Sequence, residues 1–369
     1  MNIPKKRFAK RIVICLTIAA ALAAAGVGGY ALYGKAQAKK IPGLTAKEAL
    51  EYTLRQNENG VITVGTIQNG KMSYTVYGEN GVEIDRKPHT YEIGSLTKTF
   101  TAAMVCTAVQ EGKLSLDASL DAYLPLPEGH HYPTIRQLLT HTSGYKAYYF
   151  EGPMISNFFK GRNDFYGIGD SMVLSRLAKN DMADSAYGFT YSNFGYAALG
   201  LVLEEIYQTE YTTLINDFAQ NKLGLAATHI SDGNGDLGNN WDWMPGDAYM
   251  SAGALTSDIE DMLQYAKLQL GRTVCGDACL EPLKEIHAST SAYKMLGIRM
   301  DEIAYGWIID AENNIIWHNG GTGGYNCYVG LDTQNKNAVV VLSNLAPGYR
   351  IPATVIGIKA LTEMRNGGQ

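Results

Sequence analysis

The sequence lacks the short patterns that mark several common functions. It contains neither a C-x-x-C pair nor an H-E-x-x-H pattern, which are frequent signatures of zinc sites. It therefore predicts no metal site, and no cofactor is expected. Basic residues cluster only near the N-terminus, and the net charge is −5, so a nucleic-acid partner is not expected. A G-x-S-x-G pattern is also absent, which argues against an α/β-hydrolase nucleophile elbow.

Cysteine is scarce, with five residues in a chain of 369. Cys15 stands at the start of an apolar run rather than its end, so it is not interpreted as a lipidation site. Cys275 and Cys279 could close a small disulfide loop in an oxidising compartment, or remain unpaired thiols, and the sequence leaves both alternatives open. Cys106 is predicted to pack in the core. His130 and His131 are predicted to lie in a solvated loop, and His141 to hydrogen-bond within its own turn.

The first forty residues differ from the rest of the chain. Five basic residues precede residues 12–34, a run of 23 residues without a charge, which is long enough to span a bilayer. Positive charge before such a run keeps the N-terminus in the cytoplasm and sends the downstream chain across. An A-x-A cleavage site at residues 36–38 makes a signal peptide an equal alternative. We therefore expect residues 41–369 to be extracytoplasmic, either membrane-anchored through residues 1–40 or secreted.

Hydrophobic patterning predicts strands near both ends of the chain and helices between them. Residues 61–78 alternate around Asn69-Gly70, which is typical of a hairpin. Residues 96–111 and 194–208 are helical in period, and residues 256–271 predict a helix capped by Thr256 or Ser257. Residues 145–190 are predicted to form an irregular, aromatic-rich connection. Strands are predicted at 304–310, 313–320, 324–332 and 337–345, with a helix near 353–365.

This order predicts an α/β (α+β) fold with one antiparallel sheet built from both ends of a single domain, residues 41–369. We expect a sheet subdomain from about 45–95 and 295–369, flanked by helices. An all-helical subdomain, from about 96–294, is expected to be inserted between them.

Ser95 and Lys98 are the first candidates for chemistry. Serine needs a base within hydrogen-bond reach to act as a nucleophile, and residues three apart on a helix share a side. A neutral lysine could therefore accept the serine proton, and the helix N-terminus would favour the oxyanion. The alternative is a serine cap followed by a solvated lysine, so other residues must decide.

Two distant stretches supply partners for this pair. Tyr191 and Asn193 stand two apart just before a predicted helix, so their phenol and amide are expected to face one cavity. His318-Asn319-Gly320 ends an apolar strand and is followed by Gly321, and glycine lets another backbone approach closely.

The ordered motifs Ser-x-x-Lys, Tyr-x-Asn and His-Asn-Gly resemble the penicillin-binding protein and class C β-lactamase superfamily of serine hydrolases. The resemblance covers about residues 50–365 and implies the β-lactamase/transpeptidase fold. It also implies a role for each motif residue: Ser95 as the acylated nucleophile, Lys98 as its proton partner, Tyr191 as a proton relay, Asn193 as an orienting amide for Lys98 and substrate, the N–H groups of Ser95 and Gly321 as the oxyanion hole, and His318 and Gly320 as part of the pocket.

The third motif departs from the Lys-Thr-Gly typical of β-lactamases. Histidine is mostly neutral at pH 7 and Asn319 lacks the threonine hydroxyl, so a substrate carboxylate would be held more weakly. Arg299 and Arg350 are candidates for a replacement cation. The resemblance thus implies a hydrolase for D-alanine amides or esters of the bacterial envelope, such as a D-Ala-D-Ala carboxypeptidase or a D-alanyl-teichoic-acid esterase. The alternatives are a β-lactamase or a penicillin-binding sensor, with β-lactams as covalent ligands.

Overall fold

The computed structural model describes residues 40–367. The segments that suggest an anchor or a signal peptide lie outside this range. Within it, no helix is both long and apolar enough to cross a membrane. From Thr45 onward the chain forms one compact unit, which carries all the motifs above.

The centre of this unit is a nine-stranded sheet built from both ends of the chain. Its order is β3-β2-β1-β12-β11-β10-β9-β8-β7, and every neighbouring pair is antiparallel. The predicted antiparallel sheet is therefore confirmed. Its strands are β1 (Ile62–Gln68), β2 (Lys71–Tyr77), β3 (Glu83–Ile84), β7 (Lys284–Glu285), β8 (Glu302–Ile303), β9 (Ile308–Asp310), β10 (Ile315–Gly321), β11 (Asn326–Asp332) and β12 (Asn337–Ser343).

The predicted hairpin at the start of the sheet forms as expected. Gln68 pairs with Lys71, which leaves Asn69 and Gly70 as a two-residue turn. Both have positive φ, 51° and 75°, as a type I′ turn requires. Asparagine and glycine tolerate this conformation best, so this dipeptide sets the register of β1 and β2.

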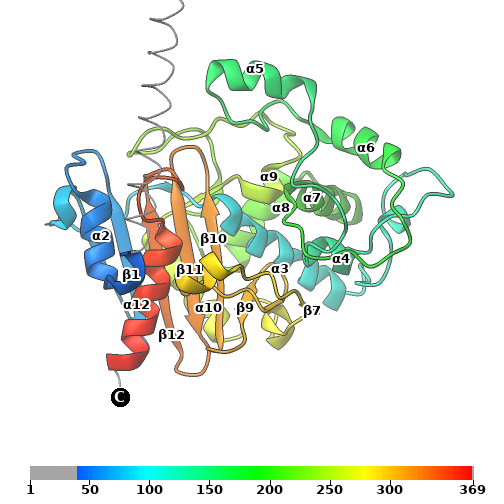
Figure 1. Cartoon of the computed structure of the whole chain (residues 1–369). Coiled ribbons are helices and arrows are strands. Elements are labelled where there is room, and N and C mark those ends of the chain that lie inside the picture. Colours follow the sequence, from blue (N-terminus) through cyan, green and yellow to red (C-terminus); the bar gives the residue numbers. More distant parts are fainter. Residues whose placement is uncertain (1–39, 368–369) are drawn as a thin grey trace, which may run out of the picture. The chain divides into compact units, whose positions relative to one another are not determined.

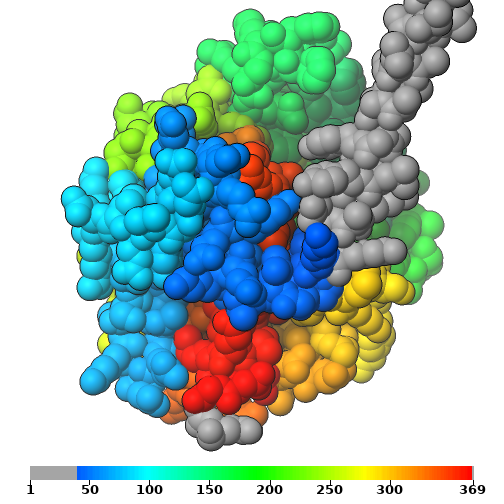
Figure 2. All heavy atoms as spheres, turned by 60° about the vertical axis from the view of Figure 1, so that its left-hand side comes forward, coloured from blue at the N-terminus to red at the C-terminus, as the bar shows by residue number. Residues whose placement is uncertain are grey.

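Helices cover both faces of the sheet. On one face, α12 (Ala353–Gly367) packs against β11 and β12 and beside α2 (Ala46–Leu54), as Figure 1 shows. The Ala46 N–H donates to Glu363 across 2.8 Å, and Figure 2 shows the blue N-terminal residues directly beside the red C-terminal helix. On the other face lies α10 (Ile259–Leu270), whose Ile259 side chain would be 2.8 Å from a Cβ at Gly65 of β1.

The middle of the chain is mostly helical. Its helices are α3 (Thr97–Gln110), α4 (Ile135–Leu139), α5 (Gly152–Lys160), α6 (Asp170–Lys179), α7 (Asn193–Tyr207), α8 (Tyr211–Asp217), α9 (Met250–Gly253) and α11 (Ser291–Met295). A small sheet β4-β6-β5 lies among them, formed by Tyr91–Glu92, Leu255–Ser257 and His229–Ile230. The division into two subdomains stays a prediction. Helix α10 belongs to the predicted helical part by its residue range, yet it packs on the large sheet.

Two local predictions were wrong. Residues 145–190 are not wholly irregular, since they contain α5 and α6. Helix α5 has nine residues and lies in a stretch rich in glycine, asparagine, aspartate and aromatic residues, a composition that resembles a loop. The cap of α10 is Asp258, whose side chain accepts the Asp261 N–H at 2.8 Å, because Thr256 and Ser257 belong to β6.

Candidate active site

Ser95 lies on a tight turn between β4 and α3. The turn, Gly94–Leu96, is a 3-10 helix that leads directly into α3. No side chain among the described residues caps either helix by a hydrogen bond, so the alternative of Ser95 as a helix cap is not what the geometry shows. Gly94 enters the turn with φ of +49°, and a Cβ there would lie 2.6 Å from the backbone N of Gly321. A glycine is therefore needed to bring the serine turn against β10.

Lys98 is held beside the Ser95 hydroxyl. Its side chain is fully buried, with Nζ 3.0 Å from Ser95 Oγ and 2.6 Å from the carbonyl oxygen of Ala252. No carboxylate pairs with Lys98 within residues 40–367. Burial therefore lowers the pKa of Lys98 well below its usual value. A neutral amine can donate one N–H to Ala252 and turn its lone pair toward the serine.

Tyr191 lies beside both Ser95 and Lys98. The Lys98 Nζ is 4.9 Å from the centre of the Tyr191 ring. Burial raises the pKa of Tyr191 above its usual range, and a hydrogen bond with Ser95 opposes that rise only in part. The phenol is therefore protonated at neutral pH, while the neighbouring amine is neutral.

His141 packs against the ring of Tyr191. Its ring is buried and tilted against Tyr191, with the centroids 4.4 Å apart. Its Nδ1 accepts the N–H of Ser192 at 3.1 Å, so the other ring nitrogen, Nε2, carries the proton. The expectation of a hydrogen bond within its own turn was thus wrong for Nδ1, because a partner 51 residues away takes that atom. No sequence signal linked these two positions.

Asn193 opens α7 two residues after Tyr191. Its backbone N–H donates to the carbonyl of Ala147 at 2.9 Å, which fixes its position. Its Oδ1 is buried and has no hydrogen-bond partner among the described residues. The expected bond from Asn193 to Lys98 is absent from the contacts within residues 40–367, where the Ala252 carbonyl takes that role. An unsatisfied buried amide oxygen is suited to accept an N–H from a ligand.

The glycines after His318 bring β10 against the nucleophile. A Cβ at Gly320 would lie 1.9 Å from the carbonyl oxygen of Ile93 and 2.9 Å from the Ser95 backbone N. Only glycine fits there, and Gly321 comes next with its N beside Gly94. The backbone N–H groups of Ser95 and Gly321 are thus brought to one place, as the oxyanion-hole prediction requires.

Strand β10 also offers an edge along which a substrate could lie. Strand β11 pairs with all of β10, but β9 pairs only with Ile315–Trp317. His318 to Gly321 therefore have one edge that no described strand covers. An extended ligand could hydrogen-bond along it.

The chain as a whole is also similar to one protein family. The family model described as Beta-lactamase matches residues 44–358. The chain belongs to the beta-lactamase family. It is also similar to Protein flp from Staphylococcus aureus strain MW2, at 25% identity over 337 residues, a match that covers 81% of this chain. The chain spans 62% of the length of that relative.

Solved structures of similar fold agree with this assignment. A beta-lactamase/D-alanine carboxypeptidase from Yersinia pestis, complexed with citrate, superposes with a TM-score of 0.69 at 18% identity and covers 89% of this chain and 98% of its own. An octameric penicillin-binding protein homologue from Pyrococcus abyssi has a TM-score of 0.66 at 22% identity, covering 83% and 73%. At such identities the likeness shows the fold alone, and the fold is that of the beta-lactamase family.

In this beta-lactamase family member, His318 contributes no cation to the site. It is 3% exposed, and burial lowers its pKa to about 3. Its Nδ1 lies 2.6 Å from the carbonyl oxygen of Asn319, which makes Nδ1 the protonated nitrogen. Asn319 points to the opposite face of β10, where its amide donates to Thr354 of α12 at 2.9 Å.

Neither arginine suggested by the sequence replaces the missing cation. The Arg299 guanidinium pairs with Glu312. Arg350 Nη1 donates to the backbone carbonyls of Tyr52, Thr53 and Arg55, at the end of α2. Both side chains are therefore committed to other contacts.

Glu92, which no sequence motif singled out, joins three segments around the site. It is 2% exposed and accepts the Thr322 hydroxyl at 2.5 Å and the Trp241 N–H at 2.6 Å. It thereby fixes the turn after β10 to the loop that carries Trp241. This loop and Gly323 and Gly324 line a cavity of about 480 Å³, together with the segment after β12.

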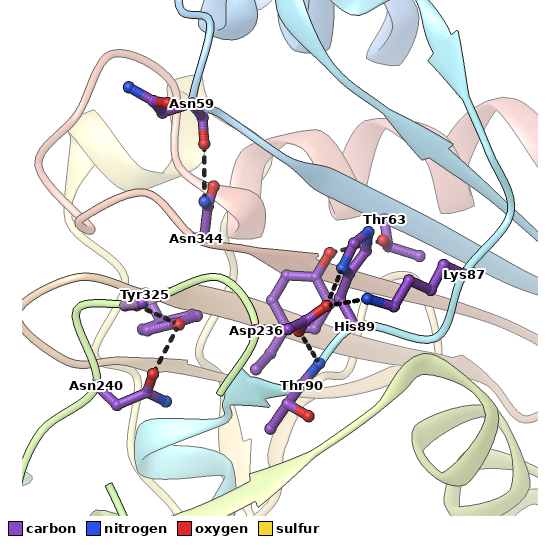
Figure 3. A network of polar contacts seen from close by, with 11 residues as sticks. Asn59, Thr63, Lys87, His89, Thr90, Asp236, Asn240, Tyr325 and Asn344 are labelled. Atoms are coloured by element: carbon purple, nitrogen blue, oxygen red, sulfur yellow. Dashed lines mark hydrogen bonds and ion pairs between the residues drawn. The ribbon is translucent and has the colours of Figure 1, made fainter. Parts of the chain in front are cut away.

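A second network holds the same loop from outside. Asp236 accepts hydrogen bonds from Lys87 and from the Thr90 N–H and pairs with the His89 ring, as Figure 3 shows. Nearby, the Tyr325 hydroxyl donates to the carbonyl of Gly238 at 2.5 Å. The loop over the cavity is therefore fastened at several points.

Proposed function

We propose that this chain is an exported serine hydrolase that acts through an acyl-enzyme on D-alanine amides or esters of the bacterial cell envelope, with esters preferred. The observation that carries the hydrolase assignment is the 3.0 Å contact between Ser95 Oγ and a buried Lys98 amine that has no counter-ion among the described residues. Export and contact with the membrane rest on the uncharged run of residues 12–34 behind basic residues.

Acylation begins with proton transfer from Ser95 to Lys98. The neutral amine accepts the hydroxyl proton as Oγ attacks the substrate carbonyl carbon. The N–H groups of Ser95 and Gly321 stabilise the oxygen that becomes negative. When the intermediate collapses, the protonated phenol of Tyr191 donates a proton to the leaving alcohol or amine, and Lys98 returns its proton to the phenolate.

Deacylation reverses the roles. A water molecule enters where the leaving group was. Tyr191 passes its phenolic proton to Lys98 and takes a proton from this water as the water attacks the acyl carbon. The Ser95 oxygen then leaves and takes a proton back from Lys98. Lys98 and Tyr191 interact, so their pKa values describe the pair rather than either group alone. In the free protein, the direction of the two pKa shifts favours Lys98 as the base and Tyr191 as the acid.

The charges around the site support an ester rather than a peptide with a free carboxylate. His318 is neutral, and Arg299 and Arg350 are engaged elsewhere. The cavity of about 480 Å³ beside the turn after β10 is not lined by Ser95, Lys98 or Tyr191. Among the described residues, Arg162 is the one cation in its lining, and Asp242, which lines it too, lies 3.0 Å away. A negative terminus would gain little from such a site, whereas a D-alanyl ester inside a polymer presents no carboxylate.

The decisive experiment uses the full chain purified in detergent. It is incubated separately with a labelled penicillin, a peptide ending in D-Ala-D-Ala and a D-alanyl glycerol ester, while intact mass and free D-alanine are followed. We expect a transient adduct on Ser95 and faster D-alanine release from the ester. Release from the peptide alone would reject the ester preference. A stable adduct with no turnover would indicate a sensor, and rapid penicillin hydrolysis a β-lactamase.

The control separates the nucleophile from other serines. Ser95→Ala should lose both adduct and turnover, while Ser73→Ala, which changes an exposed serine on β2, should retain them. Full activity in the Ser95→Ala protein would contradict the mechanism as a whole.

A further inference from the structure

Three of the four cysteines that the structure describes gather in one buried place. Cys106 comes from the middle of α3, whereas Cys275 and Cys279 come from the segment after α10. All three side chains are at most 5% exposed, none is in a disulfide, and their sulfur atoms all lie within 4.8 Å of one another. Cys106 and Cys275 are 169 residues apart in sequence, so no short motif could reveal the group.

The spacing of these sulfur atoms matches what a thiolate-bound metal ion needs. A metal–sulfur bond of about 2.3 Å places the ligand sulfurs about 3.8 to 4.0 Å apart in tetrahedral or trigonal geometry. Sulfur atoms within 4.8 Å of one another therefore need to move by less than an ångström to share one ion. A disulfide would need two of them to approach to about 2.0 Å, with a restricted torsion between the two side chains.

Neighbouring residues hold the cluster in place. The Tyr305 hydroxyl lies within hydrogen-bonding reach of Cys106. Gln110 Nε2 donates to the carbonyl of Cys275 at 2.7 Å and fixes the loop that carries this ligand. Partners that hold ligand residues in this way are usual around metal sites.

We propose that Cys106, Cys275 and Cys279 form a structural site for one thiophilic d10 cation, Zn²⁺ or Cu⁺. Soft thiolate ligands select these ions over Mg²⁺ or Ca²⁺. On binding, each thiol gives its proton to solvent and forms one metal–sulfur bond, with no change of oxidation state. Three thiolates complete a trigonal Cu⁺ site, whereas four-coordinate Zn²⁺ takes its fourth ligand from water or the Tyr305 hydroxyl.

The site would clamp the helix that positions the catalytic lysine. Lys98 and Cys106 both lie on α3, about two turns apart, so an ion at Cys106 ties the far part of that helix to the segment after α10. The ion is distant from the chemistry and would act on stability. The melting temperature should rise by several degrees with metal, because an ion that binds only the folded chain stabilises it by mass action.

The test uses the full chain with Cys15→Ala, purified in detergent with a chelator and a thiol-free reductant. Zn²⁺, Cu⁺ or Co²⁺, the last as a spectroscopic probe, is then added under anaerobic conditions. We expect one equivalent to bind, with a thiolate-to-metal absorption band for Co²⁺ and Cu⁺. Because all four remaining thiols are buried, alkylation is followed in increasing denaturant, where the bound ion should slow the reaction of Cys106, Cys275 and Cys279 more than that of Cys327, a readout that needs no further variant. Competition with chelators then shows which ion is preferred.

The matched variants are Cys106→Ser, Cys275→Ser and Cys279→Ser against Cys327→Ser, the fourth buried cysteine. Affinity should fall at least about 100-fold in the first three and stay unchanged in the last. The site is refuted if neither Zn²⁺ nor Cu⁺ binds, if all three variants keep their affinity, or if the unreduced protein has lost two hydrogens through a disulfide within the trio. None of these outcomes bears on whether Ser95 is acylated, so the two proposals fail separately.

Discussion

Lys98 illustrates how one buried side chain couples activity to stability. Its amine is useful because it is neutral, and it is neutral because burial, with no counter-ion within residues 40–367, disfavours its charged form. In the unfolded chain the same amine holds a proton up to about pH 10.5. Folding at neutral pH therefore has to release that proton, which lowers stability.

The first prediction concerns Lys98→Met. Above the lowered pKa of Lys98 and below 10.5, the unfolded wild type binds one proton more than the folded protein, so its stability rises with pH, by up to about 1.4 kcal/mol per unit. The variant lacks this dependence. We expect its stability relative to wild type to decrease as pH rises, with acylation abolished at every pH. Denaturant unfolding from about pH 7 to 9.5 measures it, and Lys47→Met, at an exposed position, should show no such trend.

His318 allows a direct test of the carboxylate argument. Burial keeps the histidine neutral, and it would also lower the pKa of a lysine there, but a substrate carboxylate bound beside the lysine would favour its charged form. We expect His318→Lys to raise kcat/KM for a D-Ala-D-Ala peptide relative to a D-alanyl ester by about tenfold, or about 1.4 kcal/mol. His318→Gln, which is neutral, should leave that ratio near the wild-type value. An unchanged ratio in the lysine variant would mean that the carboxylate does not reach this position.

Sequence reasoning identified the candidate reacting residues more readily than the residues that hold them. Ser95, Lys98, Tyr191 and His318 carry side chains whose chemistry is visible in isolation, and ordered motifs linked them. Glu92 and His141 act through contacts with segments far away in sequence, and the Ala252 carbonyl belongs to the backbone. Nothing in the residue types at these positions predicts such pairings.

The strands that carry the site depend on close backbone contact rather than on side chains. Gly320 of β10 lies where any Cβ would overlap the carbonyl of Ile93 and press on the Ser95 backbone. We expect Gly320→Ala to slow acylation at least about 100-fold, because displacing reacting groups by about 1 Å has effects of this size. Penicillin adduct formation measures the rate. Gly348→Ala, at a position with open space around it, should acylate normally, and a Gly320→Ala protein with normal acylation would contradict this view of β10.

Whole elements were predictable where a period or a turn signal was strong. The β1–β2 hairpin, α3, α7 and strands β10 to β12 match the expected ranges closely. Helices α5 and α6 were missed because short helices bounded by glycine and asparagine resemble loops in composition. The capping of α10 by Asp258 was missed because Thr256 is drawn into the small sheet by pairing with Glu92 and His229, a tertiary effect.

Across the whole domain, the site lies where segments from the entire chain meet, and separate polar networks keep them together. Burial alone would raise the pKa of Asp236, but hydrogen bonds from Lys87, His89 and the Thr90 N–H outweigh it and lower that pKa to about 2. The carboxylate thus joins the stretch before β4 to the loop that lines the cavity (Figure 3). The pairing stabilises the fold fully above the unfolded value near pH 3.8 and is lost as pH falls through about 2.

Asp236→Asn should therefore loosen the loop without touching the nucleophile. Because the carboxylate is partly exposed, we expect a loss of about 1 kcal/mol at pH 7, which shrinks as pH falls toward about 2 and the wild type loses the same pairing. The loop also carries Trp241, which Glu92 holds beside the turn after β10, so KM for the ester should rise more than kcat falls. Denaturant unfolding and steady-state kinetics measure the two effects. Asp184→Asn, on an exposed loop, is the matched control. If Asp236→Asn lowers kcat while leaving KM unchanged, the loop acts on the reacting groups themselves, and the expectation that it contacts the substrate is wrong.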